Sequence, residues 1–153
     1  MLEAGMPLRI VLAEDRASSR EALTALMKCR GFMVAGAAAD GRGAVGLCAQ
    51  LQPEVAVLDF DIPSMNGPAV AAEIQRVAPD TSTVALSVRR GQARVMEALR
   101  AGVRGYVLKT SAVGDLLDAI QEVSGGRIYL SPRISGRLLT AFLSKPELPA
   151  DPL

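Results

Sequence analysis

Short apolar runs alternate with amphipathic stretches five times along this chain of 153 residues, and this alternation constrains the fold more than any other feature. Most of the apolar runs lack polar alternation, which is typical of strands buried on both faces. The stretches between them repeat apolar residues at three- and four-residue spacing, as helices with one apolar face do. The expected strands are Leu8–Ala13, Met33–Ala38, Val55–Leu58, Thr83–Leu86 and Gly105–Leu108, and the expected helices are 17–30, 41–51, 67–77, 91–101 and 112–124.

This order of elements predicts a parallel, doubly wound α/β sheet with right-handed crossovers. Gly31 and Gly102 follow the first and fourth expected helices, where a residue that tolerates a left-handed backbone commonly ends a helix. In sheets of this kind, ligands bind beyond the carboxyl ends of the strands. The polar residues at those ends are therefore the candidates for a functional site.

The chain divides into three expected parts. Residues 7–125 contain the alternating pattern and form the main domain. Residues 126–144 form a helical extension, in which Ser131 is placed to cap a helix and Pro132 lies in its first turn. Residues 145–153 read KPELPADPL, and their three prolines predict a linker or tail without regular structure.

Composition and charge argue against several functions. The net charge is +1, with basic and acidic residues mixed along the chain, so neither a nucleic-acid surface nor a membrane surface is indicated. There is no apolar run long enough to span a bilayer and no signal-peptide pattern. Cys29 and Cys48 could form a bridge, a metal pair or neither. Because the chain has no histidine and no CxxC spacing, we expect reduced structural thiols and a cytoplasmic location.

Polar side chains follow four of the expected strands. They are Glu14 and Asp15 after the first, Asp59 and Asp61 after the third, Ser87 after the fourth and Lys109 after the fifth. Crowded carboxylates repel one another unless they are protonated or neutralised by a cation, and Mg²⁺ suits carboxylate oxygens and retained waters. A carboxylate can also act as a nucleophile toward phosphorus, while a cation, an ammonium and a hydroxyl stabilise the phosphoryl oxygens. The set therefore indicates Mg²⁺-dependent formation of an aspartyl phosphate.

The segments around these strand ends resemble the receiver domains of two-component response regulators. The matching segments are AED after the first strand, VLDFDIPSMNG at the third, ALS at the fourth and GYVLK at the fifth, in unbroken order over about residues 7–125. The resemblance implies a flavodoxin-like, CheY-like sheet of five strands in the order 2-1-3-4-5, with an extra C-terminal helix. It also implies a sensor histidine kinase as partner. We expect a phosphoacceptor with at most slow self-dephosphorylation, not an enzyme.

The resemblance implies a phosphoacceptor and a magnesium site. Asp59 is the implied acceptor of the phosphoryl group. Asp15 would bind Mg²⁺ directly and Glu14 through water, and Asp59 and the backbone carbonyl of Asp61 would complete the site.

It also implies a switch. Ser87 and Lys109 would hold the phosphoryl oxygens, and Tyr106 would be an aromatic switch that turns inward when Ser87 moves toward the phosphoryl group. Pro63 and Gly67 would shape the loop after the acceptor.

A narrower resemblance lies in SGGRIYLSPRISGRLL, which is similar to the segment after the receiver in NarL/LuxR-type transcription regulators. Those regulators continue through a Pro-rich linker into a helix-turn-helix domain, which this chain lacks. DNA binding is thus expected only through an output domain outside this chain. The chain is either an excised receiver or a natural single-domain protein. We also expect a homodimer through the first or fifth helix.

Some positions depart from the common receiver pattern. Val88 adds bulk where Ala or Gly is usual and would narrow access to the site, and Asp61 adds negative charge that favours Mg²⁺ over an anionic donor. We hypothesise that Arg89 pairs with Asp61 across the mouth of the site and tunes the lifetime of the phosphoryl group. Thr110 follows Lys109 where many receivers have a proline after a cis peptide, and the sequence leaves cis or trans open.

Two other functions stay open. VAVLDFD also resembles the nucleophile motif of haloacid-dehalogenase-type phosphatases, although Glu14 and Asp15 precede the nucleophile, whereas the late acidic pair of that family follows its lysine. The second alternative is a phosphorylation-independent receiver that acts as a dimerisation or docking module, which Val88 and Asp61 make credible. Phosphomonoester turnover would identify the phosphatase, and a lack of reactivity toward acyl phosphates would identify the docking module.

Overall fold

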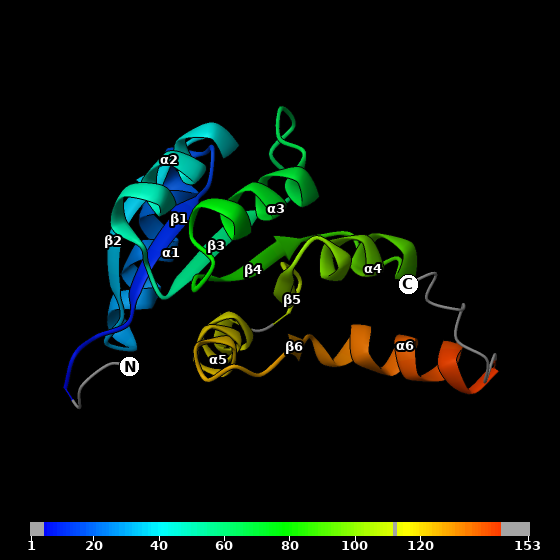
Figure 1. The fold of residues 1–153 in the computed structure, drawn as a ribbon. Helices are drawn as coiled ribbons and strands as arrows, with labels where there is room; N and C mark the ends of the chain where they lie inside the picture. The colour runs from blue at the N-terminus through cyan, green and yellow to red at the C-terminus, as the bar shows by residue number, and fades with distance from the viewer. Residues whose placement is uncertain (1–4, 112, 145–153) are drawn as a thin grey trace.

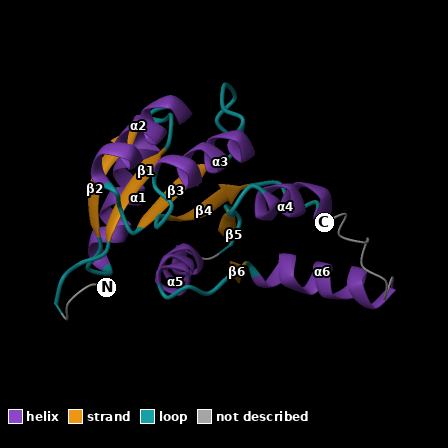
Figure 2. Ribbon diagram, viewed as in Figure 1, coloured by secondary structure: helices purple, strands orange, loops and turns teal. Residues whose placement is uncertain are grey.

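The computed structural model describes residues 5–111 and 113–144, and the expected tail at 145–153 lies outside them. A parallel sheet with the strand order β2-β1-β3-β4-β5-β6 is covered by helices on both faces (Figures 1 and 2). The strands are β1 (Arg9–Ala13), β2 (Met33–Ala38), β3 (Val55–Asp59), β4 (Ser82–Ser87), β5 (Val103–Leu108) and β6 (Tyr129–Leu130). The helices are α1 (Ala17–Cys29), α2 (Gly41–Leu51), α3 (Gly67–Val77), α4 (Gln92–Arg100), α5 (Val113–Ser124) and α6 (Pro132–Ser144).

The predicted doubly wound fold is confirmed, and the first five strands lie in the predicted order. The short strand β6 extends the sheet beyond the five predicted strands by pairing Tyr129 with Gly105 and Leu130 with Tyr106. Two residues are too few to show a periodic pattern, so the sequence does not reveal this strand. The pairing attaches the predicted helical extension to the edge of the sheet.

Each face of the sheet packs against its own set of helices. Val11 and Leu58 point toward α2, α3 and α4, whereas Ile10 and Val57 point toward α1 and α5. All four side chains are fully buried. Successive strand residues point to opposite faces, so two covered faces require the continuous apolar runs seen in the sequence. The polar residues therefore gather where these runs end.

Glycines follow two helices and begin a third. Gly31 and Gly102 have φ angles of +88° and +102°, which confirms the predicted left-handed residues after α1 and α4. At Gly67 an added Cβ would lie 2.6 Å from the ring of Phe60. The side chain of Asn66 accepts a hydrogen bond from a backbone N–H of α3 and so caps this helix. Together these residues let α3 start close beneath the loop that follows Asp59.

The extension after α5 is fixed by Ser131, which is fully buried. Its hydroxyl accepts a hydrogen bond from the Leu108 N–H at 3.0 Å and donates one to Asp115 at 2.7 Å. The hydroxyl thus links β5 to α5, while the backbone carbonyl of Ser131 accepts hydrogen bonds from the N–H groups of Ile134 and Ser135 at the start of α6. Ile134 of α6 is 1% exposed and joins the core on the face covered by α4.

The two cysteines carry free thiols, with Cys29 exposed at the end of α1 and Cys48 buried in α2. Burial raises the pKa of the Cys48 thiol to about 11, which keeps it protonated and unreactive near neutral pH. None of the helices in the described part of the chain is long and apolar enough to cross a membrane.

Candidate functional site

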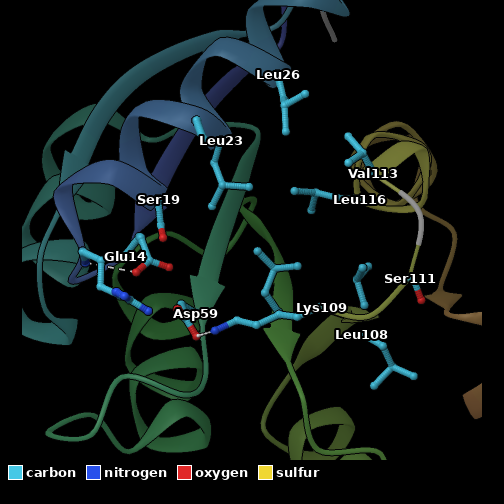
Figure 3. A pocket seen from close by; sticks show the side chains of 14 residues that line it. Glu14, Ser19, Leu23, Leu26, Asp59, Leu108, Lys109, Ser111, Val113 and Leu116 are labelled. Atoms are coloured by element: carbon cyan, nitrogen blue, oxygen red, sulfur yellow. Dashed lines mark hydrogen bonds and ion pairs between the residues drawn. The ribbon is translucent and has the colours of Figure 1, made fainter.

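The carboxyl ends of β1, β3 and β5 bring Glu14, Asp59 and Lys109 together at one end of a cavity between α1 and α5 (Figure 3). The cavity has a volume of about 390 Å³. Apolar side chains such as Leu23 and Leu116 line the remainder of its wall. A polar reaction centre thus lies at the end of a largely apolar groove.

Asp59 makes two short contacts in this centre. Its Oδ1 atom lies 2.8 Å from Nζ of Lys109 and accepts a hydrogen bond of 2.8 Å from the N–H of Asp61. Burial raises the pKa of Asp59, but its interactions with Glu14 and Lys109 oppose this, and the net pKa lies below the ordinary value. The pKa of Lys109, which burial would lower, is raised overall by the two aspartates. Asp59 is therefore an ionised carboxylate that faces a cavity.

Glu14 is the carboxyl group whose pKa is raised in this cluster. It is 3% exposed, and burial together with the neighbouring Asp59 raises its pKa to about 7. Carboxylate oxygens of Glu14, Asp15 and Asp59 all lie within 4.8 Å of one another. One ammonium cannot neutralise this group of carboxylates. The donors are oxygens and the charge is in excess, so these residues fit a hard divalent ion such as Mg²⁺.

Ser87 lies in the site, but its hydroxyl bonds to Asp61. It donates to Oδ1 of Asp61 at 2.8 Å, while the N–H of Val88 donates to Oδ2 at 2.9 Å. Nζ of Lys109 lies 3.2 Å from the same Oδ2 atom. Val88 is 57% exposed and contributes its backbone amide to the site, and the predicted narrowing of access by its side chain stays a prediction.

In this arrangement the carboxylate of Asp61 pairs with Lys109 and not with Arg89. The predicted effect of Arg89 on the lifetime of the phosphoryl group stays a hypothesis. The end of β5 places the ammonium next to Asp61, whereas Arg89 continues outward from β4 into an exposed loop. Arg89 acts through its backbone, since its N–H donates to Oγ of Ser87 at 3.0 Å.

Tyr106 is turned inward and fully buried. Its hydroxyl donates to the carbonyl of Arg89 at 2.7 Å, and its ring meets the ring of Phe60 edge-on at 6.3 Å. Burial raises the pKa of the phenol, so it stays a donor at neutral pH. Tyr106 thereby links β5 to the loop between β4 and α4. The predicted coupling between its position and that of Ser87 stays a prediction.

The peptide bond between Lys109 and Thr110 is trans, which answers the question that the sequence left open. The sequence did not indicate two further contributors to the site. They are the N–H of Val88 and the guanidinium of Arg20, which donates to the carbonyl of Glu14 at 2.8 Å. A backbone donor leaves no mark in the residue pattern. Arg20 lies one turn into α1 and looks like an ordinary surface residue.

Comparisons with known proteins agree with this geometry. The family described as "Response regulator receiver domain" matches residues 10–121. The chain is 31% identical to the chemotaxis protein CheY of Thermotoga maritima over 119 residues, which cover 78% of this chain and 99% of CheY. It is also 31% identical to the probable transcriptional regulatory protein NarL of Mycobacterium tuberculosis over 132 residues, which cover 86% of this chain but only 61% of NarL.

A solved structure extends the likeness to three dimensions. The two-component response regulator of the LuxR family from Aurantimonas sp. SI85-9A1 superposes with a TM-score of 0.85 at 28% identity, covering 90% of this chain and 99% of that one. Receiver domains are regulatory phosphoacceptors that bind Mg²⁺ at an acidic pocket, which here comprises Glu14, Asp15 and Asp59. The chain therefore belongs to the response regulator receiver domain family and is similar to the receivers of NarL/LuxR-type regulators.

Proposed function

We propose that Asp59 accepts a phosphoryl group from a phosphorylated sensor histidine kinase and that the product switches a transcriptional output. The observation that carries this proposal is the ionised Asp59 carboxylate, paired with Lys109 at 2.8 Å at the end of a cavity. A carboxylate is a competent nucleophile toward phosphorus when it is ionised and accessible. The cavity gives access, and Lys109 holds the charged form.

In the proposed reaction, an oxygen of Asp59 attacks the phosphorus of a phosphohistidine. An O–P bond forms while the P–N bond breaks, and the electron pair of the broken bond goes to the imidazole nitrogen. A proton on the other ring nitrogen makes the leaving group a neutral imidazole. Lys109, Ser87 and the N–H of Val88 are the donors for the phosphoryl oxygens.

The acidic residues supply the cation site of this proposal. Asp15 and Asp59 would hold Mg²⁺ directly, Glu14 through water and Asp61 through its backbone carbonyl. The bound ion would neutralise charge on the phosphoryl oxygens. The raised pKa of Glu14 supports this assignment, since a buried cluster of acids is unfavourable without a counter-ion.

The proposed switch comprises Ser87, Arg89 and Tyr106. Arg89 donates to Ser87 through its N–H and accepts from Tyr106 through its carbonyl. A movement of Ser87 would therefore displace the loop before α4 and, through it, the ring of Tyr106. Phosphorylation would favour one arrangement of this element through its differential contacts. We propose that the switch alters a surface of the domain. That surface would mediate either homodimerisation through α1 or α5 or contact with an output domain.

The test is the intact mass of the protein after incubation with Mg²⁺ and a small acyl phosphate. The wild type should gain the mass of one phosphoryl group, and the nearly isosteric Asp59→Asn variant should gain none. No gain in the folded wild type, with either an acyl phosphate or a phosphorylated histidine kinase, would contradict the proposal and favour the docking module. Repeated turnover of a phosphomonoester would instead indicate the phosphatase.

A further inference from the structure

A second carboxylate, that of Asp61, lies beside the acceptor and takes up the donors of the site. Oδ1 accepts from the hydroxyl of Ser87 at 2.8 Å. Oδ2 accepts from the N–H of Val88 at 2.9 Å and lies 3.2 Å from Nζ of Lys109. A hydroxyl, a backbone amide and an ammonium, supplied by the ends of β4 and β5, thus converge on one anion.

This set of donors is suited to the oxygens of a phosphoryl group. A transferred phosphoryl group carries its charge on three equatorial oxygens, each of which needs a donor or a cation. Lys109 is already shared, because its Nζ lies 2.8 Å from Asp59 and 3.2 Å from Asp61. Asp61 is also 20% exposed at its side chain, so water could solvate it if it turned outward. Its inward position therefore reflects the three donors and not a lack of space outside.

We propose that the carboxylate of Asp61 is an intramolecular substitute for the phosphoryl group and keeps the unphosphorylated site self-inhibited. It must leave Ser87, Val88 and Lys109 before phosphoryl oxygens can take these donors. This inference rests on the proposed function and names a regulation of the same site. Asp61 thereby slows phosphorylation and weakens the binding of phosphoryl analogues.

The same contact reaches the switch. Ser87 bonds to Asp61 through its hydroxyl and accepts from the N–H of Arg89 at 3.0 Å, and Arg89 in turn accepts from Tyr106 at 2.7 Å. The chain of contacts runs from Asp61 to the buried ring without a break. Displacement of the Asp61 carboxylate is therefore the event that frees Ser87 to turn toward Asp59.

The experiment compares wild type with Asp61→Asn. Asparagine keeps the size of the side chain but removes its charge and turns one acceptor into a donor, so it cannot satisfy all three partners. Its backbone carbonyl is unchanged. With Mg²⁺ and an acyl phosphate, the phosphoryl adduct should form about tenfold faster in the variant, the factor expected for one charge-assisted hydrogen bond. Beryllium fluoride, with Mg²⁺, should bind about tenfold more tightly in a thermal titration, for the same reason.

Asp80→Asn is the matched control. Asp80 is exposed in the turn before β4, at the opposite edge of the sheet, so its replacement removes the same charge without touching the site. This control should react and bind like the wild type. If Asp61→Asn does not fold, Asp61→Ala serves the same purpose, because it also frees the three donors.

The outcomes separate the two proposals. A labelled wild type together with an unchanged or slower Asp61→Asn, in both assays, would overturn the self-inhibition and leave the phosphoacceptor function intact. An absence of labelling and of beryllium fluoride binding in every folded variant would contradict the phosphoacceptor function and the inference with it. Faster labelling and tighter binding in Asp61→Asn, but not in Asp80→Asn, would support both.

Discussion

Charge is distributed unequally among the residues at the carboxyl edge of the sheet. Asp59 and Asp61 share the ammonium of Lys109, and Glu14 and Asp15 lie close to Asp59. Interactions with Glu14 and Lys109 hold the pKa of Asp59 below its ordinary value, whereas burial and the neighbouring Asp59 raise the pKa of Glu14 to about 7. A buried group of like charges stores unfavourable energy that a cation or a proton can release. The pH and Mg²⁺ dependence of stability are thus linked to the site.

The first prediction concerns Glu14→Gln in the absence of metal ions. The folded-state pKa of Glu14 is raised above its unfolded value, so its contribution to the free energy of unfolding is fully present below pH 4.5 and is lost as the pH rises to about 7. Glutamine does not titrate. The free energy of unfolding of the variant should therefore increase relative to that of the wild type across this window, by roughly 1–3 kcal/mol at pH 8.

The measurement is urea unfolding of both proteins in EDTA at a series of pH values. The pKa of Asp59 is lowered, so its contribution to the free energy of unfolding is lost as the pH falls below 3.8. This change lies outside the window from pH 4.5 to pH 7. A difference between the two proteins that stays constant from pH 4.5 to pH 8 would refute the proposed strain at Glu14.

The second prediction separates the ring of Tyr106 from its hydroxyl. Tyr106→Phe removes only the hydrogen bond to the carbonyl of Arg89 and should lower the free energy of unfolding by about 0.5–1.5 kcal/mol. Tyr106→Ala also removes a fully buried ring that packs on Phe60 and should cost about 3–5 kcal/mol. Denaturant unfolding of both variants tests this. Equal losses would show that the ring does not pack as described.

Among the elements, β6 and α6 are attached to the sheet through Ser131. Its hydroxyl satisfies the backbone N–H of Leu108, the last residue of β5, and bonds to Asp115 of α5. Tyr129 of β6 also donates to Asp115 through its hydroxyl. Since Lys109 follows Leu108 directly, the start of α6 is connected to the functional edge of the sheet.

The third prediction is that Ser131→Ala lowers the free energy of unfolding by about 1–3 kcal/mol, because it leaves the buried N–H of Leu108 without its partner. Ser135→Ala is the control, since Ser135 is exposed and its hydroxyl bonds to the carbonyl of Pro132 within the same helix, so its replacement should change stability by less than about 0.5 kcal/mol. Chemical unfolding of the two variants, side by side, gives the comparison. Similar losses in both would rule out the anchoring role of Ser131.

The sequence predicts the elements in which apolar residues recur in a regular pattern over several residues. The five long strands are continuous apolar runs and the helices show one apolar face, so their positions follow to within a few residues. Strand β6 carries no such signal. The sequence predicts Ser131 as a helix cap but does not reveal its bond to Leu108, because the two residues lie far apart in the sequence. In the same way, the strand ends indicate which residues share the site but not that Asp61 bonds to Val88 and Lys109 in place of Arg89.

For the whole molecule, metal binding should be coupled to folding. A ligand that binds only the native state raises the free energy of unfolding, by about 2.7 kcal/mol at a concentration of 100 times its Kd. The fourth prediction is that Mg²⁺ raises the melting temperature of the wild type in a concentration-dependent manner. Asp15→Asn should abolish most of this shift, and because Asp15 is exposed its replacement should leave the metal-free protein folded.

The control for this experiment is Asp118→Asn, on the exposed face of α5, which should keep the full shift with Mg²⁺. A melting temperature that rises equally in Asp15→Asn and in the wild type would place the ion elsewhere on the molecule.

The homodimer through α1 or α5 and the domain limits at residues 7 and 125 stay predictions.

The assignment of Asp59 as the phosphoacceptor is tested by locating the acyl phosphate chemically. After reaction with Mg²⁺ and an acyl phosphate, borohydride reduces an aspartyl phosphate to homoserine, and peptide mass mapping then locates the modified residue. We expect homoserine at Asp59 and at no other acidic residue. Homoserine at Asp15 or Asp61, or no modification of a correctly folded protein, would contradict the assignment of Asp59.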